Sequence, residues 1–137
     1  MKLLRLKSIR SKPVRASLLV LVAALSGGCM SVQLYDGPKR DRDEVARISG
    51  DPVFTAGSPI TVVLRQVDGQ DIGLTQTSVD LLEGKHQLLV DCRIAETKGG
   101  SRHSLEVDVM GGRKYRLRAE AGPALRECSA VTLEAVD

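Results

Sequence analysis

The feature that most restricts the fold of this chain is a period-two alternation of apolar and polar residues. Residues 88–94, 105–109 and 115–119 each place an apolar side chain at every second position. Successive side chains of a strand point to opposite faces, so each segment is predicted to be a strand with one buried face. No window of a dozen residues after Cys29 has the 3.6-residue period of an amphipathic helix. The sequence therefore predicts an all-β fold.

Turn residues divide the alternating region into short strands. Asp68-Gly69 is a hairpin signal, Glu83-Gly84 and Gly111-Gly112 are further turns, and Gly122-Pro123 breaks the chain before the last strand. About seven strands at this spacing favour a small antiparallel β-sandwich. The predicted strands are an edge strand at 44–48, then 60–67, 77–82, 88–94, 105–109, 115–119 and 128–136.

Charge pairing is predicted across the Gly111-Gly112 turn, which we interpret as a hairpin. Glu106 and Asp108 would then lie near Arg116 and Arg118 on the solvent-exposed face. Such exposed ion pairs contribute little to stability.

The N-terminus has the order of a secretory signal peptide. Residues 1–15 carry six Lys or Arg and no acid, residues 16–25 are apolar or small, and Ser26-Gly27-Gly28 precedes Cys29. The apolar stretch is too short to span a membrane as a helix, which needs about 20 residues.

Residues 25–29, Leu-Ser-Gly-Gly-Cys, resemble the lipobox of bacterial lipoproteins, although Ser26 stands where Leu is commonest. The resemblance implies that Cys29 receives a diacylglycerol on its sulfur, becomes the first residue of the mature chain and is acylated, for example with palmitate. Met30 in place of Asp implies the outer membrane. The alternative is ordinary signal cleavage near Gly28, which leaves Cys29 as a plain thiol.

Processing changes both the length and the charge of the chain. We predict a signal peptide at 1–28, a lipidated N-terminus and tether at 29–43, and a β-sandwich domain at 44–137. Removing 28 of 137 residues leaves 109, and the loss of six basic residues turns the net charge from +3 to −3. A folded domain without an excess of basic residues does not favour nucleic-acid binding. The aromatic residues are also too few for base stacking. They are Tyr35, Phe54 and Tyr115.

Cys92 and Cys128 remain once Cys29 is assigned to lipid. Two cysteines in an oxidising compartment most simply form one disulfide, worth on the order of 3–4 kcal/mol. A buried pair of free thiols and a metal site are the alternatives. A metal would need His86 and His103 as further ligands, since these are the only histidines.

A second resemblance covers roughly residues 35–120. Val-Asp-Gly at 67–69, Leu-Glu-Gly-Lys-His at 82–86 and Gly-Arg-Lys-Tyr at 112–115 follow one another. This order is similar to small β-sandwich domains named after a Pro-Glu-Gly-Ala stretch and to uncharacterised proteobacterial lipoproteins, with Glu83 in the usual place of a proline. The resemblance implies a β-sandwich in the cell envelope and no catalytic activity.

The polar residues form no recognisable catalytic or metal site. His86 follows a turn and is predicted to pack or hydrogen-bond there. Ser104 and Glu106 share one face of a strand while His103 points to the other, so they do not form a triad. Residues 68–71 lack the spaced acids of a calcium loop. We predict no cofactor and no metal.

The sequence therefore predicts a lipid-anchored envelope protein that is a non-catalytic interaction or accessory module rather than an enzyme. An edge strand would recruit an envelope protein by adding a strand from the partner. The alternative is a periplasmic module that binds a small ligand or glycan, for which the aromatic walls of a usual pocket are lacking. A hydrolase that uses Ser104 is the third and weakest hypothesis.

Overall fold

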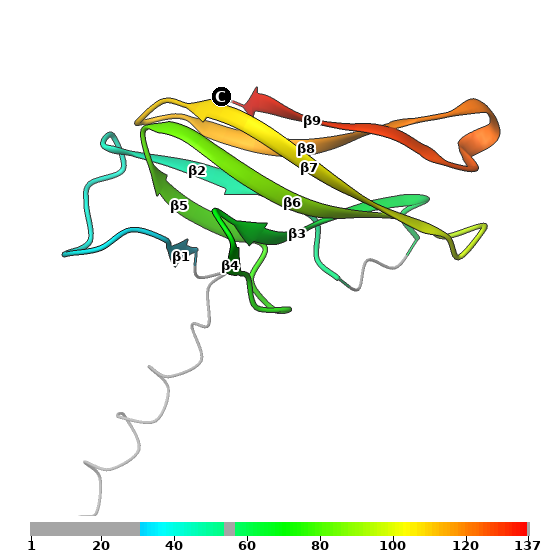
Figure 1. The fold of residues 1–137 in the computed structure, drawn as a ribbon, viewed down its shortest axis with the longest axis horizontal. Helices are drawn as coiled ribbons and strands as arrows, with labels where there is room; N and C mark the ends of the chain where they lie inside the picture. The colour runs from blue at the N-terminus through cyan, green and yellow to red at the C-terminus, as the bar shows by residue number, and fades with distance from the viewer. Residues whose placement is uncertain (1–30, 54–56, 137) are drawn as a thin grey trace, which may run out of the picture.

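The computed structural model describes residues 31–53 and 57–136 (Figure 1). The predicted signal peptide and Cys29 lie outside the described residues. Within these ranges the chain forms nine strands and one short 3-10 turn. They are β1 (Val32–Gln33), β2 (Val45–Ser49), β3 (Ile60–Val67), β4 (Gln70–Asp71), β5 (Ser78–Leu82), β6 (Gly84–Ile94), β7 (Gly100–Val109), β8 (Lys114–Ala121), η1 (Pro123–Leu125) and β9 (Cys128–Val136).

The strands form two sheets that pack face to face, which confirms the predicted all-β sandwich. The five-stranded sheet has the order β1-β5-β2-β8-β9, and the four-stranded sheet has the order β4-β3-β6-β7. The five-stranded sheet is mixed rather than antiparallel as predicted, because β1 pairs with β5 and β2 pairs with β8 in parallel. The four-stranded sheet is antiparallel throughout.

The predicted alternation places the apolar side chains between the sheets. On β6 the inward residues Leu88, Val90 and Cys92 are fully buried, while Leu89 and Asp91 face outward. The opposing sheet contributes buried side chains at every second position of its central strands. The inner layer of these two faces includes Ala46, Ile48, Val62, Leu64, Val79, Leu81, Leu88, Val90, Leu117 and Val131.

A disulfide joins Cys92 of β6 to Cys128 of β9, which confirms the predicted pairing. The two cysteines are 36 positions apart in the sequence and belong to different sheets. The bond therefore links the sheets covalently through the buried layer.

The Asp68-Gly69 hairpin is confirmed. Val67 pairs with Gln70, which leaves a two-residue loop. Asp68 and Gly69 have φ values of 50° and 80°, the left-handed conformations that a type I′ turn requires at both central positions.

The predicted hairpin at Gly111-Gly112 is wrong. β7 and β8 lie in different sheets, and the glycines carry the chain from one sheet to the other. The Gly112 N–H donates to the Val45 carbonyl at 2.9 Å. A Cβ atom at Gly111 would lie 3.2 Å from the carbonyl oxygens of Asp43 and Glu44, so a close approach of two backbones, rather than a hairpin, explains the glycine pair.

The charge pairs predicted across that turn are also wrong, because β7 and β8 are not neighbours. Arg116 pairs with Asp51 at 3.2 Å, and Arg118 pairs with Glu134 of β9, also at 3.2 Å.

The segment predicted as an edge strand at 44–48 is instead central. It corresponds to β2, which lies between β5 and β8 in the five-stranded sheet. Ala46 and Ile48 have no exposed surface. A single turn precedes the strand, in which the Glu44 N–H donates to the Asp41 carbonyl at 3.1 Å.

Loss of the disulfide is expected to destabilise the domain strongly. Closing a loop of this length lowers the entropy of the unfolded chain and stabilises the fold by about 4 kcal/mol. The Cys92→Ser, Cys128→Ser double variant should unfold at a correspondingly lower urea concentration. Reductant should lower the midpoint of the wild type and leave the variant unchanged. A reductant-insensitive wild type would contradict the prediction.

Candidate functional site

The first described residues belong to the sandwich, not to a tether. β1 pairs with β5, with Val32 opposite Val79. The Leu34 N–H donates to the Asp80 carbonyl at 3.1 Å, and both Val32 and Leu34 pack against the core. The predicted tether at 29–43 is therefore wrong from residue 31 to residue 34. The exposed residues 36–42 form a loop between β1 and β2.

Three polar side chains fasten this N-terminal segment to the sheet, and we call them the N-terminal clasp: Ser31, Arg47 and Asp80. The Arg47 guanidinium donates to both carboxylate oxygens of Asp80, from Nε at 2.7 Å and from Nη2 at 3.0 Å. The Ser31 hydroxyl donates to Asp80 Oδ2 at 2.8 Å and accepts from Arg47 Nη2 at 2.8 Å. These contacts leave Asp80 only 5% exposed.

The clasp holds Asp80 in its charged form. Burial alone would raise the pKa of this carboxyl, but hydrogen bonds from Arg47 and Ser31, together with the charge of Arg47, outweigh it. The pKa of Asp80 therefore lies below its usual value.

Two other carboxyls are shifted in the same direction. Burial opposes ionisation of Asp68, but hydrogen bonds from Gln87 and His86 prevail and lower its pKa; a hydrogen bond from Arg102 lowers the pKa of Asp91.

These shifts predict a loss of stability in acid. A carboxyl whose pKa is lower in the folded state binds protons more readily when unfolded, so its contribution is complete above the unfolded pKa near 4 and is lost below it. The free energy of unfolding should fall as the pH drops from about 5 towards the folded pKa values. Urea titrations over this range would measure it; a flat profile would contradict the shifts.

Asp80→Asn should remove part of that acid sensitivity. The amide keeps the shape but loses charge-assisted hydrogen bonds, which are worth about 2 kcal/mol. The variant should be less stable at pH 7, and its stability should change less between pH 7 and pH 3. Asp36→Asn is the matched control, because Asp36 is exposed, and it should behave like the wild type.

Sequence reasoning missed the clasp. Its only local sign is an acid between Val79 and Leu81, within the otherwise apolar residues 79–82. The partners lie 33 and 49 positions away from Asp80, so no short motif contains them.

His86 makes the predicted hydrogen bond at its own turn, and a second one, to Asp68, that the sequence did not predict. Its Nδ1 lies 2.6 Å from Asp68 Oδ2, and its Nε2 lies 2.8 Å from the Leu82 carbonyl oxygen. Both partners accept hydrogen bonds. His86 thus joins the β3–β4 hairpin to the end of β5, which is a structural role.

The His103, Ser104 and Glu106 group does not form a triad. The register places His103 opposite Val90 on the inner face and Ser104 opposite Leu89 on the outer face; the sequence predicted that the two point to opposite faces. His103 instead bonds Ser101, with 2.8 Å between Nε2 and Oγ. Among the described residues no third group bonds the other ring nitrogen, so the pair lacks the group that would orient a catalytic base.

No metal centre forms in the part of the chain that the structure describes. It contains no group of three or more His, Cys, Asp or Glu side chains that could hold an ion. The acids at 68 and 71 face different partners: Asp68 binds His86 and Gln87, and Asp71 accepts from Gln66 at 2.7 Å.

The surface hollows formed by the described residues are open, and those at the β6–β7 turn and beside residues 71–74 carry no aromatic lining. One of about 380 Å³ lies at the β6–β7 turn beside Arg93 and Lys98. Another, of about 420 Å³, lies between residues 71–74 and the outer face of the four-stranded sheet, beside Arg65 and Arg102. Within the described ranges, no helix has the length and hydrophobicity to cross a bilayer.

Comparison with protein-family models, curated proteins and solved structures found no significant match. The two family resemblances therefore stay predictions from the sequence.

Proposed function

We propose that this protein is a lipid-anchored module of the cell envelope that binds a protein partner and has no catalytic role. The observation that carries the proposal is the position of the N-terminal clasp. Ser31, two residues after Cys29, already bonds Asp80 and Arg47.

The clasp suits a domain held close to a membrane. A lipid on Cys29 would be separated from the sheet by Met30 alone. Two residues of chain allow about 7 Å between the Cα atoms of Cys29 and Ser31. A pull on the lipid would act directly on β1 and its clasp, and through β5 on the core.

An edge strand supports the binding role. In the described part of the chain, β7, which is ten residues long, pairs only with β6 within its sheet, and β9 of the other sheet lies next to it. Such an edge accepts a strand from a partner. Charged residues on its outer face, including Arg102, Glu106 and Asp108, would discourage pairing with further copies of this chain.

Lipid attachment should depend on Cys29 alone. Intact protein from detergent-solubilised membranes should have the mass of residues 29–137 plus acyl chains, with Cys92 and Cys128 alkylated only after reduction. Cys29→Ala should move the protein from the membrane fraction to the soluble fraction. An unlipidated wild type in the soluble fraction would refute the anchor.

A partner at the β7 edge should be detectable by site-specific crosslinking in cells. A photoreactive residue in place of Glu106 should give a covalent adduct with an envelope protein. Lys114 is the matched control, because it is also exposed but lies on β8, between β2 and β9. Adducts of equal yield at both positions, or none at Glu106, would count against the edge.

A further inference from the structure

The loop of residues 73–77, between β4 and β5, lies at the same end of the sandwich as the start of the described chain. β1 and β5 are parallel neighbours, with Val32 opposite Val79. The chain that precedes each strand must therefore enter at the same end. Figure 1 shows this arrangement: the green loop before β5 and the beginning of β1 both lie on the lower side of the view.

The tip of this loop carries an exposed leucine. Leu74 is 62% exposed; among the described residues the other large hydrophobic side chain exposed to this degree is Met110, at 55%. Met110 lies at the opposite end of β5, because the next residue, Gly111, donates to the side chain of Glu83, which directly follows that strand. A single exposed leucine is common on protein surfaces, so the argument depends on its position beside the chain entry.

Arginines flank the same loop. The hollow beneath it is lined by Ile72, Leu74 and Leu89 together with Arg65 and Arg102. Both arginines pair with Asp91, from Nε atoms at 3.3 Å and 2.8 Å respectively.

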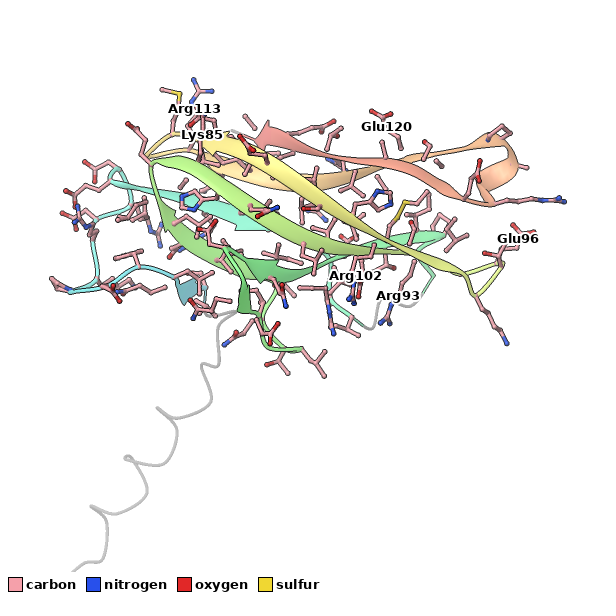
Figure 2. All side chains as sticks on the ribbon, viewed as in Figure 1. Lys85, Arg93, Glu96, Arg102, Arg113 and Glu120 are labelled. Atoms are coloured by element: carbon pink, nitrogen blue, oxygen red, sulfur yellow. A yellow bond between two sulfur atoms is a disulfide. The ribbon has the colours of Figure 1, made fainter. Side chains whose placement is uncertain are left out.

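A third arginine extends this cluster. Arg93 and Arg102 extend towards the lower side of the molecule in Figure 2, whereas Lys85, Arg113 and Glu120 lie on the upper side. All three arginines act electrostatically on Asp91, and Asp71 lines the same hollow as Arg65 and Arg102, so three positive charges face two acids. An apolar tip beside guanidinium groups matches a bilayer surface, where phosphates overlie the acyl chains.

We propose that the loop 73–77 together with Arg65, Arg93 and Arg102, here called the loop face, contacts the phospholipid headgroups, with the Leu74 side chain at the acyl-chain boundary. This inference rests on the proposed anchor at Cys29. The lipid holds the domain at the membrane, and the loop face selects which side of the domain lies against it.

The absence of tryptophan from the chain gives a direct test. Leu74→Trp places a single fluorophore on the loop face, and Met110→Trp is the matched control at the far end. Each full-length lipidated protein is reconstituted into vesicles of phosphatidylglycerol and brominated phosphatidylcholine. Emission at position 74 should shift to shorter wavelength and be quenched several-fold more than emission at position 110.

The outcomes separate the two proposals. Mass spectrometry and vesicle flotation report the anchor independently of fluorescence. An anchored protein with equal quenching at both positions would overturn the loop face and leave the proposed anchor intact. A protein that neither floats nor carries acyl chains would overturn the proposed anchor, and the loop face with it.

A second measurement needs no substitution at Leu74. Hydrogen exchange of the wild-type amides at 73–77 should be slower on vesicles than in detergent, while the amides at 110–113 should exchange equally in both. Unchanged exchange at 73–77 would contradict the proposal.

The arginines can be tested separately. Arg93→Gln with Arg102→Gln in the Leu74→Trp protein should reduce quenching on anionic vesicles more than on phosphatidylcholine alone. The same loss on both surfaces would remove the arginines from the loop face.

Discussion

Contact between the inner faces of the two sheets is the interaction on which the rest of this structure depends. The layer consists mainly of Val, Leu and Ile side chains, with Tyr115 as its only aromatic member among the described residues. Cys92 lies in the same inward row of β6 as Leu88 and Val90, so packing of the two sheets is what brings it to Cys128. Small domains bury a modest share of their surface, and the covalent link between sheets adds to what this thin layer provides.

The sequence predicts which side chains face inward much better than which strands are neighbours. Alternation at 88–94 and 115–119 depends only on the geometry of a single strand, and the structure confirms it. Neighbours depend on the packing of the whole chain. β2 was predicted at an edge, but it lies between β5 and β8. Ala46 and Ile48 have no exposed surface in this position. The pair Gly111-Gly112 is compatible with two structures, a hairpin and a close approach of two backbones. Only the backbone of Asp43 and Glu44, which lies against the glycines, distinguishes the second from the first.

Sequence reasoning at the N-terminus was likewise limited to patterns formed by neighbouring residues. The predicted lipid site is contained in five consecutive residues, so a local pattern is enough to suggest it. The His86 contact with the Leu82 carbonyl at its own turn was also foreseeable, whereas its contact with Asp68 depends on the pairing of β3 with β6. The N-terminal clasp joins positions 31, 47 and 80, and each residue alone resembles an ordinary polar residue of a solvent-exposed face. Only the parallel pairing of β1 with β5 makes them one site.

That pairing also relates the two proposals to each other. β1 and β5 enter from the side that carries the loop face, whereas β9 and the later part of β7 lie on the upper side of Figure 1, and these two strands contact each other. If Cys29 carries the lipid and the loop face meets the bilayer, the start of β7 at Arg102 lies beside the membrane, and the later part of the strand, with Glu106, lies further from it. A lipid alone would let the domain rotate about its anchor, and the edge would then face the partner only part of the time. A second contact at Leu74 restricts this rotation, so the short connection to Cys29 and the loop face together keep the β7 edge open to a partner.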